Sequence, residues 1–375
     1  MRQIDSTCAR EFPKVNFSEC QIDARAGLAG FGQRLGLAVR RFAVLSALIN
    51  IGGNTISTKA YRSILGAIGN TPSIWLDRLT RKHGLKGRIM AKLDYLNPGY
   101  SKKDRAALGV IDEAEARDLL EPGQVVVELT SGNMGAGLAM VCALRGYPFV
   151  AVMSAGNSQE RARMMRAFGA EVVLVPQAEG GVSGQVTGDD LALVEAEVLR
   201  ICAARGAFRA DQFELQGNPL AHELGTGPEL WEASDGTLTA FADFVGSGGT
   251  YSGVIKALQQ KAKVRGYIVE PEGAEALAGL PIVARSHPIQ GGGYAKADLR
   301  FMKDAPVDGW LSVSGDAARE TARELAQVEG IFGGFSGGAN VAAAMHLLSD
   351  LEEGGRIAVI IPDSGLKYLS TDLWA

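Results

Sequence analysis

The chain has 375 residues, of which 46% are hydrophobic and 21% charged, so it has enough apolar material for one large or two medium domains. Its net charge is −4, and it therefore lacks the strong positive field that attracts nucleic acids or anionic membrane surfaces. The apolar run at 42–49 is too short to span a bilayer. We therefore expect neither a nucleic-acid nor a membrane partner.

Four cysteines and four histidines are scattered along the chain, without the spacing that is typical of a metal site. The sequence therefore predicts no metal. Cys142 and Cys202 fall within apolar helical patterns, where cysteine behaves as a small core residue. Reduced cysteines fit a cytoplasmic protein, because disulfides are rare in that compartment.

Residues 1–60 form an N-terminal extension that differs in character from the rest of the chain. Its segment 25–41 is basic and amphipathic, as in a transit peptide. Four acidic residues precede that segment and weaken this reading. We prefer a helical arm that packs on a neighbouring subunit.

From about residue 61 onward, short apolar runs alternate with helical patterns. Strands are predicted at 88–93, 125–129, 149–153, 172–175, 241–245, 267–269 and 357–361. Helices are predicted at 103–119, 133–145, 159–168, 191–204, 251–261, 317–329 and 340–348. The glycine-rich stretch 178–190 is predicted to be a surface loop. This alternation predicts an α/β fold with mostly parallel sheets covered on both faces, whose ligands gather beyond the carboxyl ends of the strands.

The first polar cluster is Asn97-Pro-Gly-Tyr-Ser-Lys-Lys-Asp-Arg105, which follows a strand and opens a helix. Ser101 is a candidate N-cap, with Asp104 as its acidic partner. Two lysines then occupy the first turn, where the helix dipole disfavours positive charge. One explanation is a lysine whose pKa is lowered, so that its amine can form a Schiff base. The alternative is two solvated lysines.

Two more clusters lie between a predicted strand and a helix. Thr130-Ser-Gly-Asn-Met-Gly135 gathers hydroxyls, an amide and backbone N–H groups, which suits a carboxylate or is an ordinary capping turn. Gly246-Ser-Gly-Gly-Thr250 favours a phosphate site, because its glycines let backbone N–H groups close on the anion. A dinucleotide site is the rival, but the GxGxxG pattern fails at Tyr251.

A fourth cluster is Gly333-Gly-Phe-Ser-Gly-Gly-Ala-Asn340, in which Ser336 is the one hydrogen-bonding side chain of the glycine-rich part. A tight turn would explain the same pattern. The four clusters and several other motifs together resemble the cysteine synthase and cystathionine β-synthase family of fold type II pyridoxal-5′-phosphate (PLP) enzymes. The resemblance begins near residue 64 and includes Ile68-Gly-Asn-Thr-Pro72, Gln212-Phe213, Thr226-Gly-Pro-Glu229, Ile289-Gln-Gly291 and Pro362-Asp-Ser-Gly365.

The resemblance implies a role for each matching residue. Lys103 matches the catalytic Schiff-base lysine, and Asn133 and Ser336 match the partners of the cofactor's ring hydroxyl and ring nitrogen. The cradle for the PLP phosphate is matched by Gly246, Ser247, Gly248, Gly249 and Thr250. The substrate carboxylate site is matched by Thr130, Ser131, Gly132 and Gln212.

The resemblance also implies an architecture of two doubly wound three-layer αβα domains, of the tryptophan synthase β-like kind. Residues 61–96 and 216–375 would form a large domain that binds the PLP phosphate. Residues 97–215 would form a smaller, mobile substrate domain. Members of the family are typically homodimers, so we expect a homodimer.

The implied function is β-replacement on O-acetylserine or O-phosphoserine through an α-aminoacrylate, with a sulfur nucleophile, giving cysteine or a close analogue. The partners would be a small amino acid and a small nucleophile. A β-elimination lyase, of the cysteine desulfhydrase or serine/threonine dehydratase type, and a diaminopropionate-type synthase are the alternatives, because the motifs do not encode the nucleophile. A non-catalytic sensor is disfavoured by the presence of Lys103.

The chain departs from the family pattern in several places. Tyr100 replaces a glycine, Lys102 replaces a residue that is usually apolar, and Met134 replaces a threonine. Tyr294 and Lys296 follow the Gln-Gly motif, where they could shrink the substrate pocket or bind an extra anion, or where Lys296 could simply lie on the rim.

Overall fold

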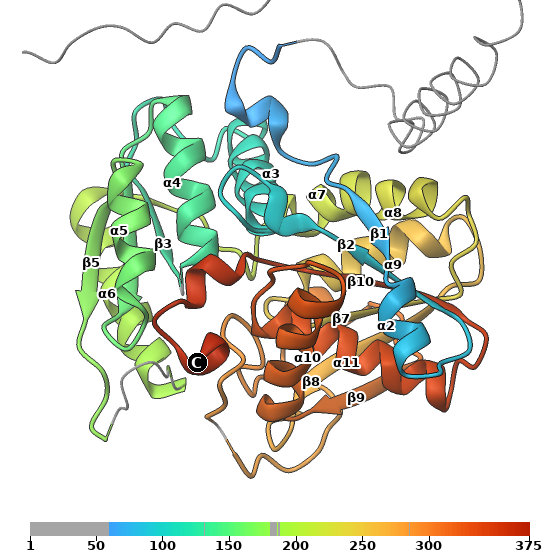
Figure 1. The fold of residues 1–375 in the computed structure, drawn as a ribbon. Coiled ribbons are helices and arrows are strands. Elements are labelled where there is room, and N and C mark those ends of the chain that lie inside the picture. The colour runs from blue at the N-terminus through green and yellow to red at the C-terminus, as the bar shows by residue number, and fades with distance from the viewer. Residues whose placement is uncertain (1–59, 131, 181–185, 187, 285) are drawn as a thin grey trace, which may run out of the picture. The chain divides into compact units, whose positions relative to one another are not determined.

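The computed structural model describes residues 60–375, except for residues 131, 181–185, 187 and 285 (Figure 1). The predicted N-terminal arm lies, but for residue 60, outside the described residues, and it stays a prediction. The predicted surface loop 178–190 is described only in part, and its last residues belong to a helix that begins at Gly188. In the described part of the chain, every helix is too short or too polar to cross a membrane.

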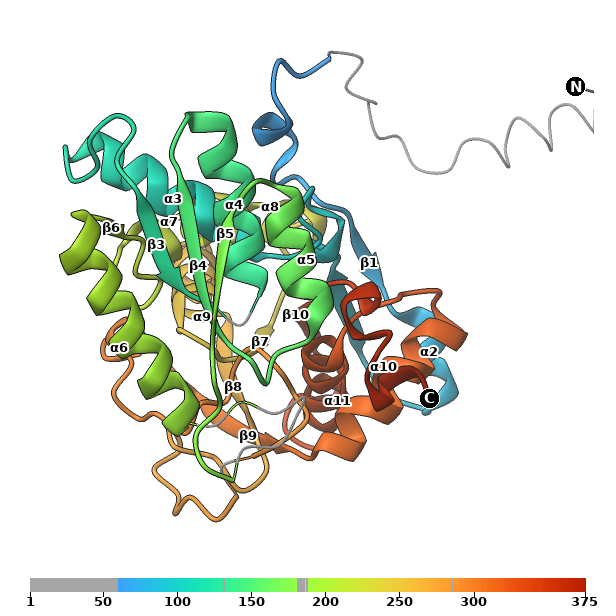
Figure 2. The same ribbon diagram turned by 90° about the vertical axis from the view of Figure 1, so that its left-hand side faces the viewer.

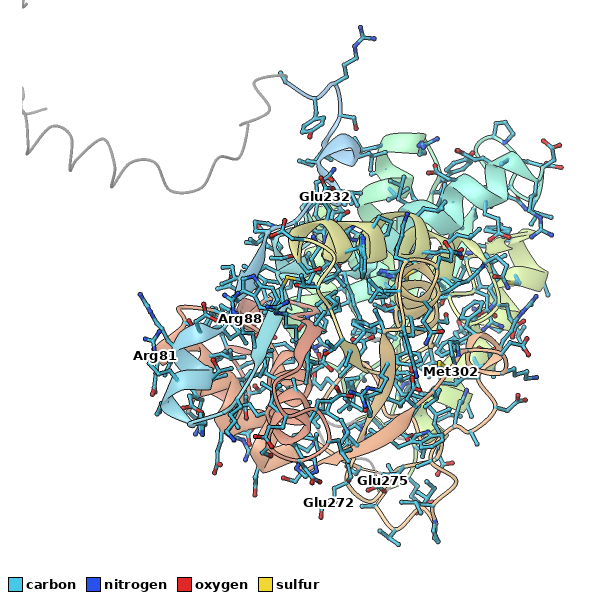
Figure 3. The ribbon with its side chains drawn as sticks, turned by 90° about the vertical axis from the view of Figure 1, so that its right-hand side faces the viewer. Arg81, Arg88, Glu232, Glu272, Glu275 and Met302 are labelled. Carbon is cyan, nitrogen blue, oxygen red and sulfur yellow. The ribbon has the colours of Figure 1, made fainter. Side chains whose placement is uncertain are left out.

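A six-stranded sheet forms the larger of two sheets, in the order β1-β2-β10-β7-β8-β9. All of its neighbouring strands are parallel except β1, which pairs antiparallel with β2. Its strands are β1 (Ser73–Trp75), β2 (Arg88–Lys92), β7 (Ala240–Phe244), β8 (Arg265–Pro271), β9 (Gly309–Val313) and β10 (Arg356–Ile360). At the β1 edge of this sheet, the Arg88 guanidinium lies 4.2 Å from the centre of the Trp75 ring and pairs with Asp77. Arg88 is labelled in Figure 3.

The smaller sheet has four parallel strands in the order β5-β4-β3-β6 (Figure 2). Its strands are β3 (Val126–Leu129), β4 (Phe149–Ser154), β5 (Glu171–Val175) and β6 (Phe208–Arg209). The two central strands, β3 and β4, are buried along their whole length. Such continuous apolar runs are typical of parallel strands that are covered on both faces.

Helices cover both faces of each sheet, because successive side chains of a strand point to opposite faces. In the large sheet, Ala240 and Ala242 pack with α2, α10 and α11, whereas Phe241 packs with α8 and α9. In the small sheet, Val126 packs with α3, α4 and α5, whereas Val127 packs with α6. The predicted architecture of two three-layer αβα arrangements with mostly parallel sheets is therefore confirmed.

The helices differ from the predicted ones mainly at their ends. They are α2 (Asp77–Lys82), α3 (Lys103–Ala116), α4 (Asn133–Arg145), α5 (Gln159–Ala167), α6 (Gly188–Arg205), α7 (Gly217–Ala221), α8 (Gly227–Ala233), α9 (Gly249–Gln259), α10 (Gly315–Val328) and α11 (Phe335–Ser349). A π-helical turn, η3 (His222–Thr226), joins α7 to α8. The sequence patterns missed α2, α7 and α8, which are short, and the strands β1, β6 and β9. The domain boundaries proposed from the resemblance stay a prediction.

The predicted cap of α3 is confirmed for Ser101 but not for Asp104. The backbone of Lys102 is already helical, and its side chain makes no cap hydrogen bond. The hydroxyl of Ser101 accepts a hydrogen bond from the Lys103 N–H at 3.3 Å, as a capping side chain does. Asp104 does not complete a capping box, because its carboxylate accepts from the Gly99 N–H at 2.5 Å. Burial of that carboxylate raises the pKa of Asp104 to about 7.

Candidate active site

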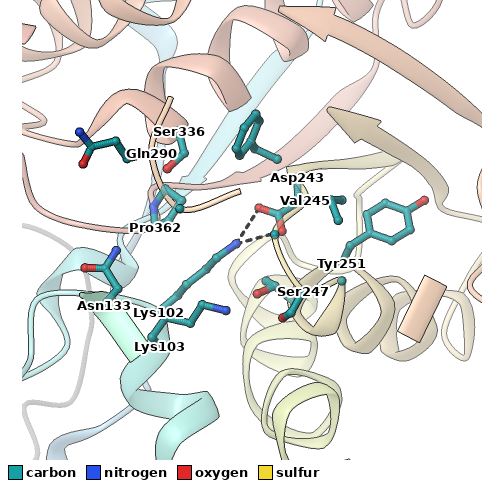
Figure 4. A pocket seen from close by; sticks show the side chains of 15 residues that line it. Lys102, Lys103, Asn133, Asp243, Val245, Ser247, Tyr251, Gln290, Ser336 and Pro362 are labelled. Atoms are coloured by element: carbon teal, nitrogen blue, oxygen red, sulfur yellow. Dashed lines mark hydrogen bonds and ion pairs between the residues drawn. The ribbon is translucent and has the colours of Figure 1, made fainter. Parts of the chain in front are cut away.

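A pocket lies beyond the carboxyl end of β7, where three helices begin (Figure 4). Those helices are α3, α4 and α11, and the turn between β7 and α9 closes one side. The predicted site residues that line it are Lys103, Asn133, Gly246, Ser247, Gly248, Thr250 and Ser336. These residues come from distant parts of the chain, and the fold brings them to one place as the parallel topology predicts.

The glycines of the turn 246–250 have no room for side chains. A Cβ atom on Gly246 would lie 2.8 Å from the backbone oxygen of Gly291, and one on Gly249 would lie 2.4 Å from Asn218 Oδ1. Gly248 has φ +86°, which favours glycine, and it precedes the first turn of α9. The turn is therefore a backbone cradle at a helix N-terminus, the arrangement that binds phosphate.

Two buried side chains support the hydroxyls of this cradle from behind. Asn218 Nδ2 donates to Ser247 Oγ at 3.0 Å and to the backbone oxygen of Gln212 at 2.7 Å. His222 Nε2 lies 3.3 Å from Thr250 Oγ1, and its Nδ1 lies 2.9 Å from Thr226 Oγ1. Both supporting residues belong to the segment from α7 to η3, whose role the sequence patterns did not reveal, because neither residue sits in a glycine-rich turn.

The two adjacent lysines have different surroundings in this pocket. Burial is the main cause that lowers the pKa of Lys103 to about 8, and the positive charge of Lys102 adds to that shift. Lys102 is itself buried, and its ammonium pairs with Asp243 at 3.0 Å. The alternative of two solvated lysines is therefore wrong. A lysine with a pKa near 8 has a substantial neutral fraction at physiological pH, as a nucleophilic amine requires.

Asn133 is held on both sides of its amide. Its Nδ2 donates to Asp363 Oδ2 at 2.7 Å, and its Oδ1 accepts from Lys367 Nζ at 2.6 Å. Tyr368 donates to the same Asp363 oxygen. Burial lowers the pKa of Lys367 to about 8. The sequence patterns did not reveal Lys367, because a single lysine in a polar segment carries no signal of its distant partner.

The described members of the predicted carboxylate group do not line the same pocket. Thr130 Oγ1 accepts from the backbone N–H groups of Gly132 and Gly135, at 2.9 and 2.8 Å. Gln212 Nε2 lies 3.4 Å from Glu128 Oε1, and burial raises the pKa of Glu128 well above its usual value. Ser131 lies outside the described residues. In the described part of the chain, the pocket lining thus includes Asn133 from this turn but not Thr130, Gly132 or Gln212.

Ser336 is buried in the first turn of α11 and faces the pocket from the side opposite Lys103 (Figure 4). Gln290 and Pro362 lie beside it. Asp243, which the sequence analysis did not single out, is the one acidic residue among the described pocket residues. It lies inside the predicted strand 241–245, whose apolar pattern carries no signal of a carboxylate at the pocket.

The loop beyond the Gln-Gly motif lies beside Phe213. The Tyr294 ring is 6.2 Å from the Phe213 ring in an edge-to-face arrangement, and Lys296 Nζ is 5.5 Å from the same ring. Lys296 is exposed. Its ammonium therefore lies over an aromatic face at the protein surface, which favours the rim position over a buried anion site.

The chain matches the family model of pyridoxal-phosphate dependent enzymes over residues 64–363. It is 37% identical to a cysteine synthase of Staphylococcus aureus over 324 residues, covering 85% of this chain and 99% of that protein. It is 39% identical to the O-ureido-L-serine synthase of Streptomyces lavendulae over 317 residues, covering 84% of this chain and 93% of that protein.

Solved structures agree with these matches. The crystal structure of O-acetyl serine sulfhydrylase isoform 3 from Entamoeba histolytica superposes with a TM-score of 0.78 at 34% identity, covering 87% of this chain and 95% of that one. The similarity thus extends over almost the whole of the known protein. It includes the four strand–turn–helix clusters from which the pocket was built.

Proposed function

Because the chain belongs to the pyridoxal-phosphate dependent enzymes, we propose that it catalyses β-replacement on an activated serine, O-acetylserine or O-phosphoserine, with a small sulfur nucleophile, giving cysteine or a close analogue. The observation that carries this proposal is that one pocket holds both a phosphate cradle and a half-buried lysine with a lowered pKa. The named activities of the relatives, cysteine synthase and O-acetyl serine sulfhydrylase, support the same reaction class.

The residues present fit PLP. The cradle of Gly246, Ser247, Gly248, Gly249 and Thr250 has the open backbone that a phosphate needs, because a Cβ atom added at any of its glycines would meet its nearest neighbouring atom at 2.4–2.8 Å. In the proposed site this cradle would hold the cofactor's phosphate, Lys103 would bind its aldehyde carbon, Asn133 would serve its ring hydroxyl and Ser336 its ring nitrogen. When bound, the cofactor supplies an electron sink for charge that develops on the substrate's α-carbon.

Lys103 has a second role in the proposal. Its amine, when free, would take the proton from the substrate's α-carbon at Nζ. A pKa near 8 suits this task, because the amine is neutral often enough to accept a proton near pH 7 and basic enough to keep it.

Ser336 contributes to the proposed reaction because its side chain carries no negative charge. A neutral hydroxyl cannot hold a positively charged ring nitrogen as a carboxylate would. Ser336 would therefore leave the ring nitrogen of a bound cofactor without a full positive charge, a condition that suits departure of a β-substituent, as β-replacement requires.

The substrate carboxylate is assigned to the turn at Thr130, Ser131 and Gly132, together with Gln212. Two features support this assignment: the turn precedes α4, and its neighbour Asn133 lines the pocket. The turn belongs to the small sheet, within the proposed mobile domain 97–215. Closure of that domain would bring the carboxylate group to the cofactor and exclude water.

We also propose a cytoplasmic homodimer, as the family resemblance implies. The β-elimination reading, in which the product is pyruvate and ammonia, uses the same residues and is separated from β-replacement only by the acceptor.

The decisive experiment follows the visible absorbance of the purified protein while O-acetylserine or O-phosphoserine is added, followed by sulfide or thiosulfate. We expect a donor-dependent spectral change that the sulfur nucleophile reverses, with a thiol amino acid as product. The control is Lys103→Ala, which should lose the change. Pyruvate formation without an acceptor would instead establish the lyase. A protein that takes up no PLP would exclude both reactions.

A further inference from the structure

A buried ion pair stands beside the proposed catalytic lysine. Lys102 Nζ lies 3.0 and 3.1 Å from the two carboxylate oxygens of Asp243, and both side chains line the pocket (Figure 4). The Asp243 side chain is 1% exposed and that of Lys102 10%. The two residues come from the start of α3 and from β7, 141 positions apart. Such a pair is not needed for stability, because apolar residues of similar volume often serve as well or better.

The pair is held in one arrangement. Asn340, on α11, donates from Nδ2 to Ile360 O at 2.8 Å and lies 3.3 Å from Asp243 Oδ1. The Asn340 oxygen accepts from the Phe244 N–H at 2.6 Å, so the amide cannot turn round. Asp243 is therefore fixed by a side chain whose own bonds are satisfied, which is how a preorganised site is built.

Three ionisable groups act on the pKa of Lys103: Lys102, Asp243 and Glu128. Besides burial, the positive charge of Lys103 acts in turn on His222 and lowers its pKa. Burial keeps His222 neutral by holding its pKa well below the usual value, and raises the pKa of Glu128 well above it. The strongest local charges are therefore the Lys102 ammonium, which lowers the pKa of Lys103, and the Asp243 carboxylate, which raises it.

We propose that Lys102 is a positioning residue that engages Asp243 and so prevents this buried carboxylate from becoming the counter-ion of Lys103. With both Asp243 oxygens within 3.1 Å of Lys102, the pair is electrically almost neutral from outside. A carboxylate without that partner would attract the nearest cation, and the Lys103 ammonium is in the same pocket. Lys102 thereby keeps the Lys103 amine in its reactive form.

The proposal predicts opposite effects for the two halves of the pair. Lys102→Met leaves Asp243 to pair with Lys103, so the Lys103 amine becomes protonated over a wider pH range. Asp243→Asn removes the carboxylate and leaves the Lys102 charge, so the amine becomes neutral at lower pH. The double variant Lys102→Met with Asp243→Asn removes both charges and should behave nearly as the unmodified chain. Lys102→Arg keeps the charge and is the matched control.

The test is the pH dependence of PLP binding by the full chain. The cofactor is removed, and the dissociation constant for added PLP is measured by its absorbance between pH 6 and 9.5. For Lys102→Met we expect binding about tenfold weaker at pH 7 and restored by pH 9, which corresponds to a shift of about one pH unit. Asp243→Asn should shift the profile in the opposite direction, and the double variant should lie within about threefold of the unmodified chain.

Several results would overturn the proposal. The affinity of Lys102→Met for PLP could be reduced equally at pH 7 and pH 9, or the added Asp243→Asn substitution could fail to restore it. Either result would show that Lys102 acts only by packing. Circular dichroism checks that each variant folds. If Lys102→Met does not fold, the direction in which Asp243→Asn shifts the pH profile of PLP binding decides the question alone. The inference rests on the proposed function in taking Lys103 as the amine that binds PLP. Borohydride reduction followed by peptide mass spectrometry tests that premise separately, because it identifies the lysine that carries the cofactor. Label on Lys102 would reject both the proposed role of Lys103 and the inference. Label on Lys103, together with unshifted pH profiles of PLP binding, would reject only the inference.

Discussion

Two strand–turn–helix segments, 130–135 and 246–250, look alike in sequence and differ in structure. Each follows a buried parallel strand and contains a glycine with positive φ, at Gly132 and Gly248. The second turn lines the pocket with its backbone, whereas the first uses the Thr130 oxygen to accept from its own backbone and contributes Asn133. Similar turn chemistry can therefore build a preformed anion cradle in one place and a self-capped turn in another.

The physical reason for the difference lies in what packs behind each turn. Behind the cradle, Asn218 and His222 contact the hydroxyls of Ser247 and Thr250. Behind the other turn, a Cβ on Gly132 would meet the Arg161 side chain at 2.4 Å. The cradle is thus fixed by the large sheet and the segment from α7 to η3. The turn 130–135 depends on the small sheet, and in the proposed function substrate binding would complete it.

The largest expected effect is a loss of PLP affinity, caused by a substitution in the glycine-rich turn 246–250. Gly249→Ala places a Cβ 2.4 Å from Asn218 Oδ1 and should weaken PLP binding by about 100-fold, because the backbone N–H groups and the supporting amide must both move. Equilibrium titration with PLP measures this loss. Gly188→Ala is the control, since its added Cβ would meet nothing within 4 Å. Unchanged PLP affinity in Gly249→Ala would show that the turn does not hold the phosphate.

A second change should affect the other turn alone. Thr130→Val removes the acceptor of two backbone N–H groups and should raise the KM for the amino-acid donor by about tenfold, because an unsatisfied polar group costs about 1–3 kcal/mol. PLP affinity should not change. Steady-state kinetics and PLP titration on the same sample separate the two effects. Weaker PLP binding with an unchanged KM would contradict the assignment of this turn to the carboxylate.

A smaller effect tests the layer behind the cradle. Asn218→Leu removes the donor to Ser247 Oγ and should weaken PLP binding by about fivefold, the value of one neutral hydrogen bond. The same substitution in a Ser247→Ala background should cost little more, because the shared contact is already gone. PLP titration of the four proteins gives the coupling. Additive losses would mean that Asn218 acts through another contact.

The smallest expected effect concerns the backbone conformation of Tyr100, in the turn that precedes Lys103. Tyr100 has φ +63°, a conformation that a residue with a Cβ adopts only with strain, and its side chain is 49% exposed. Tyr100→Gly should therefore raise the free energy of unfolding by about 1 kcal/mol, as measured in urea. Tyr100→Ala keeps the strain and should show no such gain. If Tyr100→Ala and Tyr100→Gly raise the free energy of unfolding equally, the cause is removal of the tyrosine side chain and not relief of backbone strain.

The sequence by itself determined the fold class and the place of the site. Alternating apolar runs and helical patterns gave seven correct strands and the parallel sheets, and polar turns after strands located the pocket at their carboxyl ends. These features are local, because strand burial and turn chemistry depend on residues a few positions apart. The choice of Lys103 over Lys102 came from the family resemblance, since both lysines occupy the same helix start.

Only the tertiary structure decided which distant side chains meet. It paired Lys102 with Asp243, 141 positions away, and Asn133 with Lys367, 234 positions away. It also placed His222 against Thr250. No periodicity or spacing encodes such contacts, because they depend on how whole helices pack around the sheets. The pKa of a buried amine is set by those contacts and by its loss of water, and so the chemistry of Lys103 became visible only in the folded chain.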